Sequence, residues 1–357
     1  VQIASSTPAL RAGQSATIAF VVDRPAIDFT DSDVSVSGGT LSAFSGSGSY
    51  YFAIFTPLPG STAAGTISVA AAAFTSEAGN PNVFGQLATP IAINTVQPTI
   101  VVSSATAALK AGQTATVAFS LSEATVDFTL DDVLVSGGVL SSFTGSGASY
   151  AATFTPTAGF VGAGTVSVPA GAFTGAAGNP NTSGSLTSAI AINTVFPSLA
   201  IGASTSTLLA GQTATITFTL SEISTNFTAA DVGAVGGTLS GFTGSGTSYS
   251  ATFTPQAGYA GSGRVTVAAG GFTGAIGNPN SAAALVPALA INTVLPTVAI
   301  STNTAALRAG QAAVIGFALG EPSTDFTVAD VTVTGGTLSG FSGSGASYSA
   351  IFTPTAD

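Results

Sequence analysis

The sequence contains no cysteine, histidine, methionine or tryptophan. Without cysteine the chain can form no disulfide, no thiolate metal site and no cysteine nucleophile. Without histidine it lacks the commonest general base and the commonest transition-metal ligand. Both absences argue against catalysis, and we expect the chain not to be an enzyme.

Charged residues are also scarce. They make up 6% of the chain, against roughly 25% in typical globular proteins. The five Lys and Arg residues are scattered, and the net charge is −10. With no basic patch, binding of nucleic acid or of an anionic membrane surface is not expected. No apolar run is long enough for a transmembrane helix, so we also expect no membrane insertion of this segment.

What the chain does contain is a repeat of 99 residues. The tripeptide Ala-Gly-Gln recurs in register at Ala12, Ala111, Ala210 and Ala309. A period of this length fits one independent domain rather than one turn of a solenoid. The register predicts modules at residues 1–97, 98–196 and 197–295, and a truncated fourth at 296–357. Because the fourth copy stops in mid-repeat, we expect the chain to be a piece of a longer protein.

Within a copy the pattern indicates strands throughout. Residues 114–121 of the second copy (TATVAFSL) alternate apolar and hydroxyl side chains, as a half-buried strand does. The other segments that favour strands in this copy are 100–103, 132–136, 139–143, 150–155, 164–168 and 188–193. About seven short strands in about 100 residues are typical of an immunoglobulin-like sandwich. The predicted fold class is therefore all-β, with tandem Ig-like sandwiches in an elongated array and no helix.

The phenylalanines recur with the repeat, which predicts that they form the core of each module. In the second copy they are Phe128, Phe143, Phe154 and Phe173. Two sheets packed about 10 Å apart need large side chains between them. An exposed aromatic platform for sugars is the alternative interpretation. The modules are joined by short linkers ending in proline (94–98, 193–197 and 292–296), which favour a semi-rigid array in which neighbouring modules are partners.

The second copy reads AGQTATVAFSLSEATVDFTLDDVLVSGG and then VLSSFTGSGASYAATFTP, followed by Ala-Gly-Asn and an Asn-Thr linker. These elements resemble the bacterial Ig-like domains that form tandem arrays in giant cell-surface adhesins, including type I-secreted (RTX) and biofilm-associated (Bap-like) proteins. The resemblance covers every repeat. It implies an extracellular extender at the cell surface, which holds a ligand-binding tip away from the outer membrane.

The resemblance also implies calcium, which in several relatives binds near module junctions. Family members often carry Asp ahead of the Ala-Gly-Asn element and Asp in the linker. This chain instead has small residues at the first position and asparagine at the second. These residues are Ser76, Gly175 and Gly274, and Asn94, Asn193 and Asn292.

Acidic residues in one loop of each module are the candidate calcium ligands, because hard cations take six to eight oxygens, several of them from carboxylates. The candidates are Glu123, Asp127, Asp132, Glu222, Asp231, Glu321, Asp325 and Asp330. If Asn80, Asn179 or Asn278 lies at the same end of its sandwich, it could complete a weak site. The alternative is that the acids cap turns and loop amides.

Three functions follow from these observations. Near-identity of the copies and the lack of charge favour a spacer or stalk of an extracellular adhesin. Edge strands with few charged residues leave open a self-assembling fibre or matrix protein, in which identical chains are the partners. A carbohydrate-binding array is the third.

Overall fold

The computed structural model describes residues 1–355, which form β-strands with one 3-10 turn in each copy. The second module illustrates the order of the elements. Its elements are β9 (Ile100–Ser103), β10 (Ala108–Lys110), β11 (Ala115–Thr125), η2 (Leu130–Asp132), β12 (Leu134–Ser136), β13 (Gly138–Pro156), β14 (Val161–Val168), β15 (Gly184–Ser185) and β16 (Ile190–Asn193).

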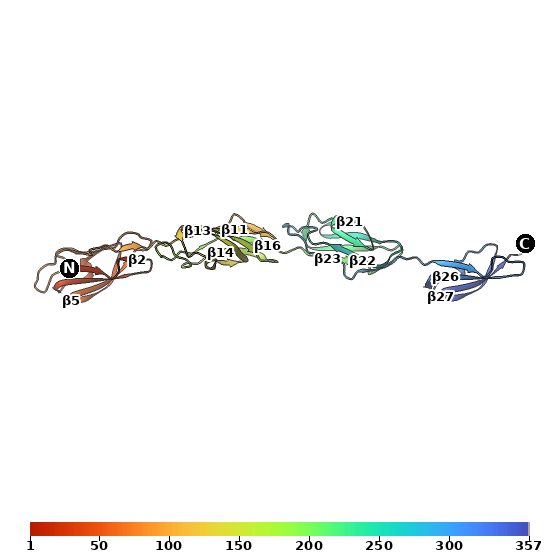
Figure 1. Cartoon of the computed structure of the whole chain (residues 1–357), viewed down its shortest axis with the longest axis horizontal. Coiled ribbons are helices and arrows are strands. Elements are labelled where there is room, and N and C mark those ends of the chain that lie inside the picture. The colour runs from red at the N-terminus through yellow and green to blue at the C-terminus, as the bar shows by residue number, and fades with distance from the viewer. Residues whose placement is uncertain (356–357) are drawn as a thin grey trace. The chain divides into compact units, whose positions relative to one another are not determined.

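These strands form two sheets. One has the order β9-β11-β13, and the other has the order β10-β16-β14-β12, with β15 paired to β14. All pairs are antiparallel except β10 with β16, which run parallel. Strands β11 and β13 carry labels in Figure 1. Buried residues from both sheets meet in one core, which confirms the predicted all-β Ig-like sandwich.

Strand β11 shows why the sequence adopts this fold. Ala115, Val117, Phe119 and Leu121 are buried, whereas the hydroxyl-bearing residues between them face outward. A period of two therefore puts one face of the strand in the core. The strand runs four residues beyond the predicted end, to Thr125, and its register with β13 shifts after Ser120.

Two details of the strand prediction were wrong. Asp132 does not begin a strand but ends the 3-10 turn η2, and β12 starts at Leu134. The Asp132 side chain accepts a hydrogen bond from the N–H of Thr129, the residue that precedes the turn, so the chain closes on itself before it extends. In addition, the two segments predicted at 139–143 and 150–155 belong to the single strand β13.

The third module repeats this topology, and the described part of the fourth has one three-stranded sheet. In the first module the second sheet is divided into a pair, β2-β8, and a three-stranded sheet, β4-β6-β7. The elements of the first module are β1 (Gln2–Ser5), β2 (Ala9–Arg11), β3 (Ala16–Ala26), η1 (Asp31–Asp33), β4 (Val34–Ser37), β5 (Gly39–Pro57), β6 (Thr66–Val69), β7 (Gly85–Gln86) and β8 (Ala92–Asn94). Those of the third are β17 (Leu199–Ala203), β18 (Thr207–Leu209), β19 (Ala214–Ser224), η3 (Ala229–Asp231), β20 (Val232–Val235), β21 (Gly237–Pro255), β22 (Ala260–Val267), β23 (Ala283–Ala284) and β24 (Leu289–Asn292). The fourth contains β25 (Val298–Thr302), β26 (Ala313–Ser323), η4 (Val328–Asp330) and β27 (Gly336–Pro354).

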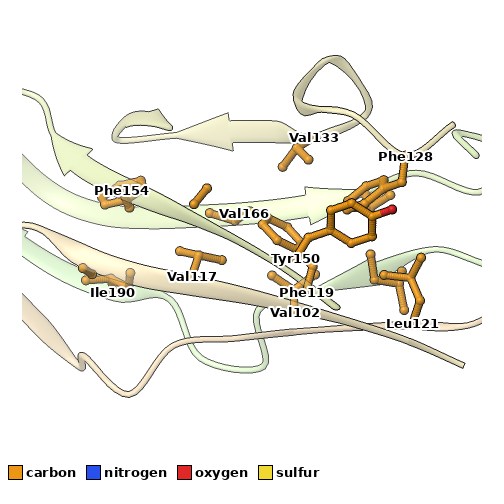
Figure 2. Packing of buried hydrophobic residues seen from close by; sticks show 14 of the residues in the cluster. Val102, Val117, Phe119, Leu121, Phe128, Val133, Tyr150, Phe154, Val166 and Ile190 are labelled. Atoms are coloured by element: carbon orange, nitrogen blue, oxygen red, sulfur yellow. The ribbon is translucent and has the colours of Figure 1, made fainter. Parts of the chain in front are cut away.

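The core of each module is built around aromatic rings. In the second module Phe119, Phe128 and Phe154 are buried side by side with aliphatic residues (Figure 2). Phe173 is also buried, and Phe143 packs half-buried against this cluster. Full burial of one such side chain stabilises a fold by roughly 1.5–3 kcal/mol. The prediction that these phenylalanines form the core is confirmed.

Each buried cluster stays within one copy of the repeat. The chain divides into two compact units, residues 1–196 and residues 197 onward, and each is described by itself. Within residues 1–355, no helix has the length and apolar character needed to cross a membrane.

Close packing around Phe154 makes Gly164 a sensitive position. A Cβ atom at Gly164 would lie 2.7 Å from the Phe154 ring, although its backbone is not in the left-handed region. We expect Gly164→Ala to destabilise the protein by about 1–3 kcal/mol, because overpacking moves the ring. Thermal or urea unfolding measures this loss, with Thr165→Ala on the same strand as the exposed control.

Replacing Phe154 with the smaller leucine tests whether a clash between the two side chains causes the loss of stability. Adding Phe154→Leu to Gly164→Ala should recover part of the loss, so that the double variant is more stable than the sum of the single changes implies. Strict additivity of the two losses would contradict a clash between these side chains.

Candidate functional site at the end of the second module

Two loops meet at one end of the second module, and an aromatic contact joins them. The first of them, the acidic loop, follows β11 and contains Phe128. The second loop follows β14 and contains Phe173. The two ring centroids lie 5.1 Å apart in the core. The Tyr150 hydroxyl donates a 3.2 Å hydrogen bond to the carbonyl of Thr125, which fixes the start of the acidic loop. Corresponding tyrosine bonds occur in the other three modules.

Asp127 ties the two loops together. Its carboxylate accepts hydrogen bonds from the N–H of Thr174 (3.1 Å) and from the Thr174 hydroxyl (2.8 Å), and also from the Thr125 hydroxyl. Partial burial raises the pKa of Asp127, but the hydrogen bonds from Thr125 and Thr174 outweigh this and hold the pKa below its ordinary value. Asp28 makes the same bonds to Thr75 in the first module.

Asp132 points into its own turn. The N–H of Thr129 donates to Asp132 Oδ2 at 2.7 Å, and the Thr129 hydroxyl donates to the same oxygen at 3.1 Å. Asp231 and Asp330 make the same pair of bonds to the threonine three residues earlier. These three candidate ligands therefore serve as caps of the 3-10 turns.

The glutamates Glu123 and Glu222 lie over the loop that follows β14 or its counterpart. A Cβ atom placed on Gly175 would lie 2.3 Å from Glu123 Oε1, so the carboxylate lies directly against the backbone of that loop. In the third module the N–H of Ala275 donates to Glu222 Oε2 at 3.2 Å. Both glutamates therefore contact the backbone of the second loop.

In the fourth module Glu321, Asp325 and Asp330 line one open hollow of about 430 Å³. Asp325 accepts a 2.5 Å hydrogen bond from the Ser323 hydroxyl. The candidate acids of this module thus border the same space, and two of them, Asp325 and Asp330, accept hydrogen bonds from residues of their own loop.

Calcium binding by these acids stays a prediction. Across residues 1–355 no three acidic side chains gather closely enough to form a metal-binding group. Asp127 and Asp132 each turn at least one oxygen toward backbone or hydroxyl donors. The geometry that the structure brings together is a set of loop caps, the alternative that the sequence had left open.

The second loop carries a side chain that reaches the first module. Asn179 is 0% exposed, and its Oδ1 accepts a 2.8 Å hydrogen bond from the N–H of Ala12. Its Nδ2 donates to the carbonyl oxygens of Asn94 and Val96, both at 2.9 Å. We call this group the Asn179 clamp: Asn179 of the second module with Ala12, Asn94 and Val96 of the first.

The rest of this junction is sparsely packed. A hollow of about 700 Å³ lies beside the clamp, and both the turn at residues 12–15 and Thr182 line it. The Arg11 guanidinium lies against Gly178, where a Cβ atom would be 2.0 Å from Nη1. The two modules therefore meet through polar groups rather than through a buried apolar interface.

The sequence placed Asn179 among candidate ligands but did not reveal that it joins two modules. The Gly-Asn-Pro-Asn loop and the Asn-Thr-Val linker both recur in the sequence. Their spacing, however, does not indicate that the loop of one module contacts the linker that precedes this module.

The sequence pattern also did not lead us to predict an exposed apolar face on the first module. Tyr50 and Phe52 are 60% and 45% exposed, and they pair across strands with Val21 and Ala19. Serine or alanine fills the matching positions of the other modules, and comparing the copies at this register would have revealed the difference. The replacements are Ser149 and Ala151, Ser248 and Ser250, and Ser347 and Ser349.

Comparison with known proteins gives one family. The model of the bacterial Ig-like domain matches the chain four times in succession, at residues 1–93, 94–192, 193–291 and 292–357. No curated protein matches the chain.

Several solved structures share some similarity. FdeC, an Escherichia coli adhesin, has 18% identity over 82% of this chain and 96% of its own, with a TM-score of 0.30. The titin I9–I11 tandem has 10% identity over 81% and 98%, with a TM-score of 0.24. The Yersinia pseudotuberculosis adhesin InvE has 14% identity over 60% and 66%, with a TM-score of 0.22. Similarity at this level says nothing about what this chain binds.

The lowered pKa of Asp127 predicts a pH-dependent contribution to stability. Because the folded pKa lies below the unfolded one, the stabilisation is complete above about pH 4 and is lost as the pH falls through the folded pKa. Asp127→Asn should cost about 0.5–1 kcal/mol at neutral pH, a small loss because the carboxylate is largely exposed and Asn can still accept from Thr174. Unfolding curves from pH 7 to pH 2 should show the two proteins converging in acid.

Asp131→Asn is the matched control, since Asp131 is exposed and lies in the 3-10 turn η2 of the same loop. A constant difference between wild type and Asp127→Asn across this pH range would contradict the assigned cause.

The calcium prediction is tested by thermal unfolding of the whole chain in chelator and in 10 mM calcium. A site with a dissociation constant near 1 mM would stabilise its module by about 1.4 kcal/mol at that concentration. Glu123→Gln together with Asp127→Asn should remove the second module's share. An unfolding temperature that is the same in chelator and in calcium would remove these acids as ligands.

Proposed function

Because the chain belongs to the family of bacterial Ig-like domains, which it repeats four times, we propose that it is a structural extender of an extracellular, cell-surface adhesin. In this role the chain spaces a binding tip from the surface, and the useful property of each module is its length. The function is non-enzymatic and needs no ligand of its own along the spacer.

The observation that carries this proposal is that each module closes its own core while a polar contact orders the next module. The buried clusters do not cross from one copy to another. The Asn179 clamp adds side-chain hydrogen bonds between the first and second modules on top of the covalent linker. A spacer needs this combination, since domains that merged their cores would shorten the chain.

The hydrogen bonds of the acidic residues also support a structural, non-enzymatic role. A catalytic carboxylate must be free to exchange a proton or attack a substrate. Asp127 instead accepts from Thr174, and Asp132 accepts from Thr129. Side chains committed to loop capping are what a structural module needs.

The exposed face with Tyr50 and Phe52 favours one alternative, a fibre or matrix in which identical chains associate. Modules that only provide spacing gain nothing from exposed aromatic rings, and apolar patches on a surface commonly mark contacts. The other modules carry serine or alanine there, so the first module alone would make this contact.

Solution scattering of the whole chain over a range of concentrations distinguishes the two functions. A spacer predicts a monomer with a radius of gyration at least about twice the ~21 Å of a compact globule of this length. A fibre predicts association that grows with concentration and is abolished by Tyr50→Ser with Phe52→Ala, which install the residues of the second module. A compact monomer would contradict both.

A further inference from the structure

The side-chain amide nitrogen of Asn179 is surrounded by oxygen atoms of the first module. Its Nδ2 lies 2.9 Å from the Asn94 carbonyl, 2.9 Å from the Val96 carbonyl and 3.4 Å from Asn94 Oδ1. Asn94 Oδ1 is itself held in place by the N–H of Val96, at 3.2 Å. The side chain is fully buried, so water does not compete for these positions.

The orientation of the amide follows from its neighbours. The N–H of Ala12 needs an acceptor, which Oδ1 supplies, and the two carbonyls need a donor, which Nδ2 supplies. The reversed amide would place an oxygen against two carbonyl oxygens. Buried carbonyl oxygens that converge on one point need either a hydrogen-bond donor or a cation there.

We propose that the Asn179 amide holds the first and second modules together in place of a metal ion, with Nδ2 at the position that a hard cation would otherwise take. The junction is therefore closed by neutral hydrogen bonds, and its geometry does not depend on calcium. The binding site is the oxygen set of Asn94 and Val96, and its partner is the second loop of the following module.

The first module shows that the loop does not need the contact in order to form. There the N–H of Gly79 donates to Ser76 at 2.7 Å and the N–H of Ser76 donates to Asn80 at 3.0 Å. The bonds in the second module are the same, from Gly178 to Gly175 at 2.8 Å and from Gly175 to Asn179 at 3.0 Å. Asn80 is nevertheless exposed. The loop is thus preformed, and burial of its asparagine is a property of the junction.

This inference goes beyond the proposed function, because it names what holds one junction and applies whether or not the array acts as a spacer. Calcium binding by the acidic loops is a separate question, since none of those acids contributes an atom to the Asn179 clamp. Failure of the spacer function and failure of the clamp are distinguishable, because they are measured separately. Solution scattering can show that the chain is not a spacer while the Asn179 clamp still holds the junction, and an elongated monomer can have a junction that does not depend on the clamp.

The chain has no cysteine, so two spin labels can be placed without altering other residues. Thr17 and Thr116 occupy the same exposed position in the first and second modules. Double electron–electron resonance between labels at Thr17→Cys and Thr116→Cys reports the distance distribution between these modules in the whole chain. We expect a narrow distribution that is identical in chelator and in 5 mM calcium.

Removing the donor should open the junction. Asn179→Ala loses the clamp, and we expect the width of the distribution to at least double. Asn179→Asp places a carboxylate against two carbonyl oxygens, so the distribution should widen equally in chelator. Millimolar calcium should narrow it again, because the carboxylate and the surrounding carbonyls then form an oxygen site for the cation. That recovery also shows that the variant is folded.

Asn80→Asp is the matched control, since it makes the same substitution in the same loop where the side chain is exposed. It should leave the distribution unchanged with and without calcium. A wild-type distribution that widens in chelator would show that a metal holds the junction, and an unchanged Asn179→Ala distribution would show that the clamp does not. Failure of calcium to narrow the Asn179→Asp distribution would contradict the inference that the oxygens of Asn94 and Val96 can hold a cation.

Discussion

The contact between the rings of Phe128 and Phe173 is the interaction on which the end of the second module depends. Phe128 also lies against Phe119, Phe143 and Tyr150, so the acidic loop is anchored in the centre of the aromatic core. The residues beside the two rings, Asp127 and Thr174, are thereby brought within hydrogen-bonding distance. Apolar packing sets the positions, and polar side chains then satisfy the backbone groups that the loops leave open.

A chain with few charges must satisfy its loop backbone by other means. Here aspartates, asparagines and threonines do so within each module, and Asn181 is an example: its Oδ1 accepts from the N–H of Phe173 while its Nδ2 donates to two carbonyls. Asn179, two residues earlier, uses the same chemistry between modules. One loop therefore contributes both to the folding of its own module and to the placement of the preceding one.

The copies also show how position changes the role of a residue. Asp127 and Asn226 occupy the same place, and both accept a hydrogen bond from the N–H of the facing threonine. The capping geometry thus tolerates the loss of a charge, which is consistent with a structural purpose for the acid. Asn80 and Asn179 occupy the same place in an Ala-Gly-Asn-Pro-Asn loop but differ in burial, because Asn179 contacts a neighbouring module.

The sequence by itself determined the fold class, the repeat, the membership of the phenylalanines in the core and the family. These properties follow from periodicity: alternation within 114–121 assigns one face to the core, and the 99-residue register carries that assignment to every copy. Strand ends were less predictable, because the turn at Asp132 depends on a side-chain hydrogen bond that competes with extension. Only the tertiary structure decided that Asp127 reaches Thr174 of the facing loop and that Asn179 reaches the oxygens of Asn94 and Val96. Those contacts join residues 47 and 83–85 positions apart, and local pattern carries no information about which polar groups meet when two sheets or two modules close on each other.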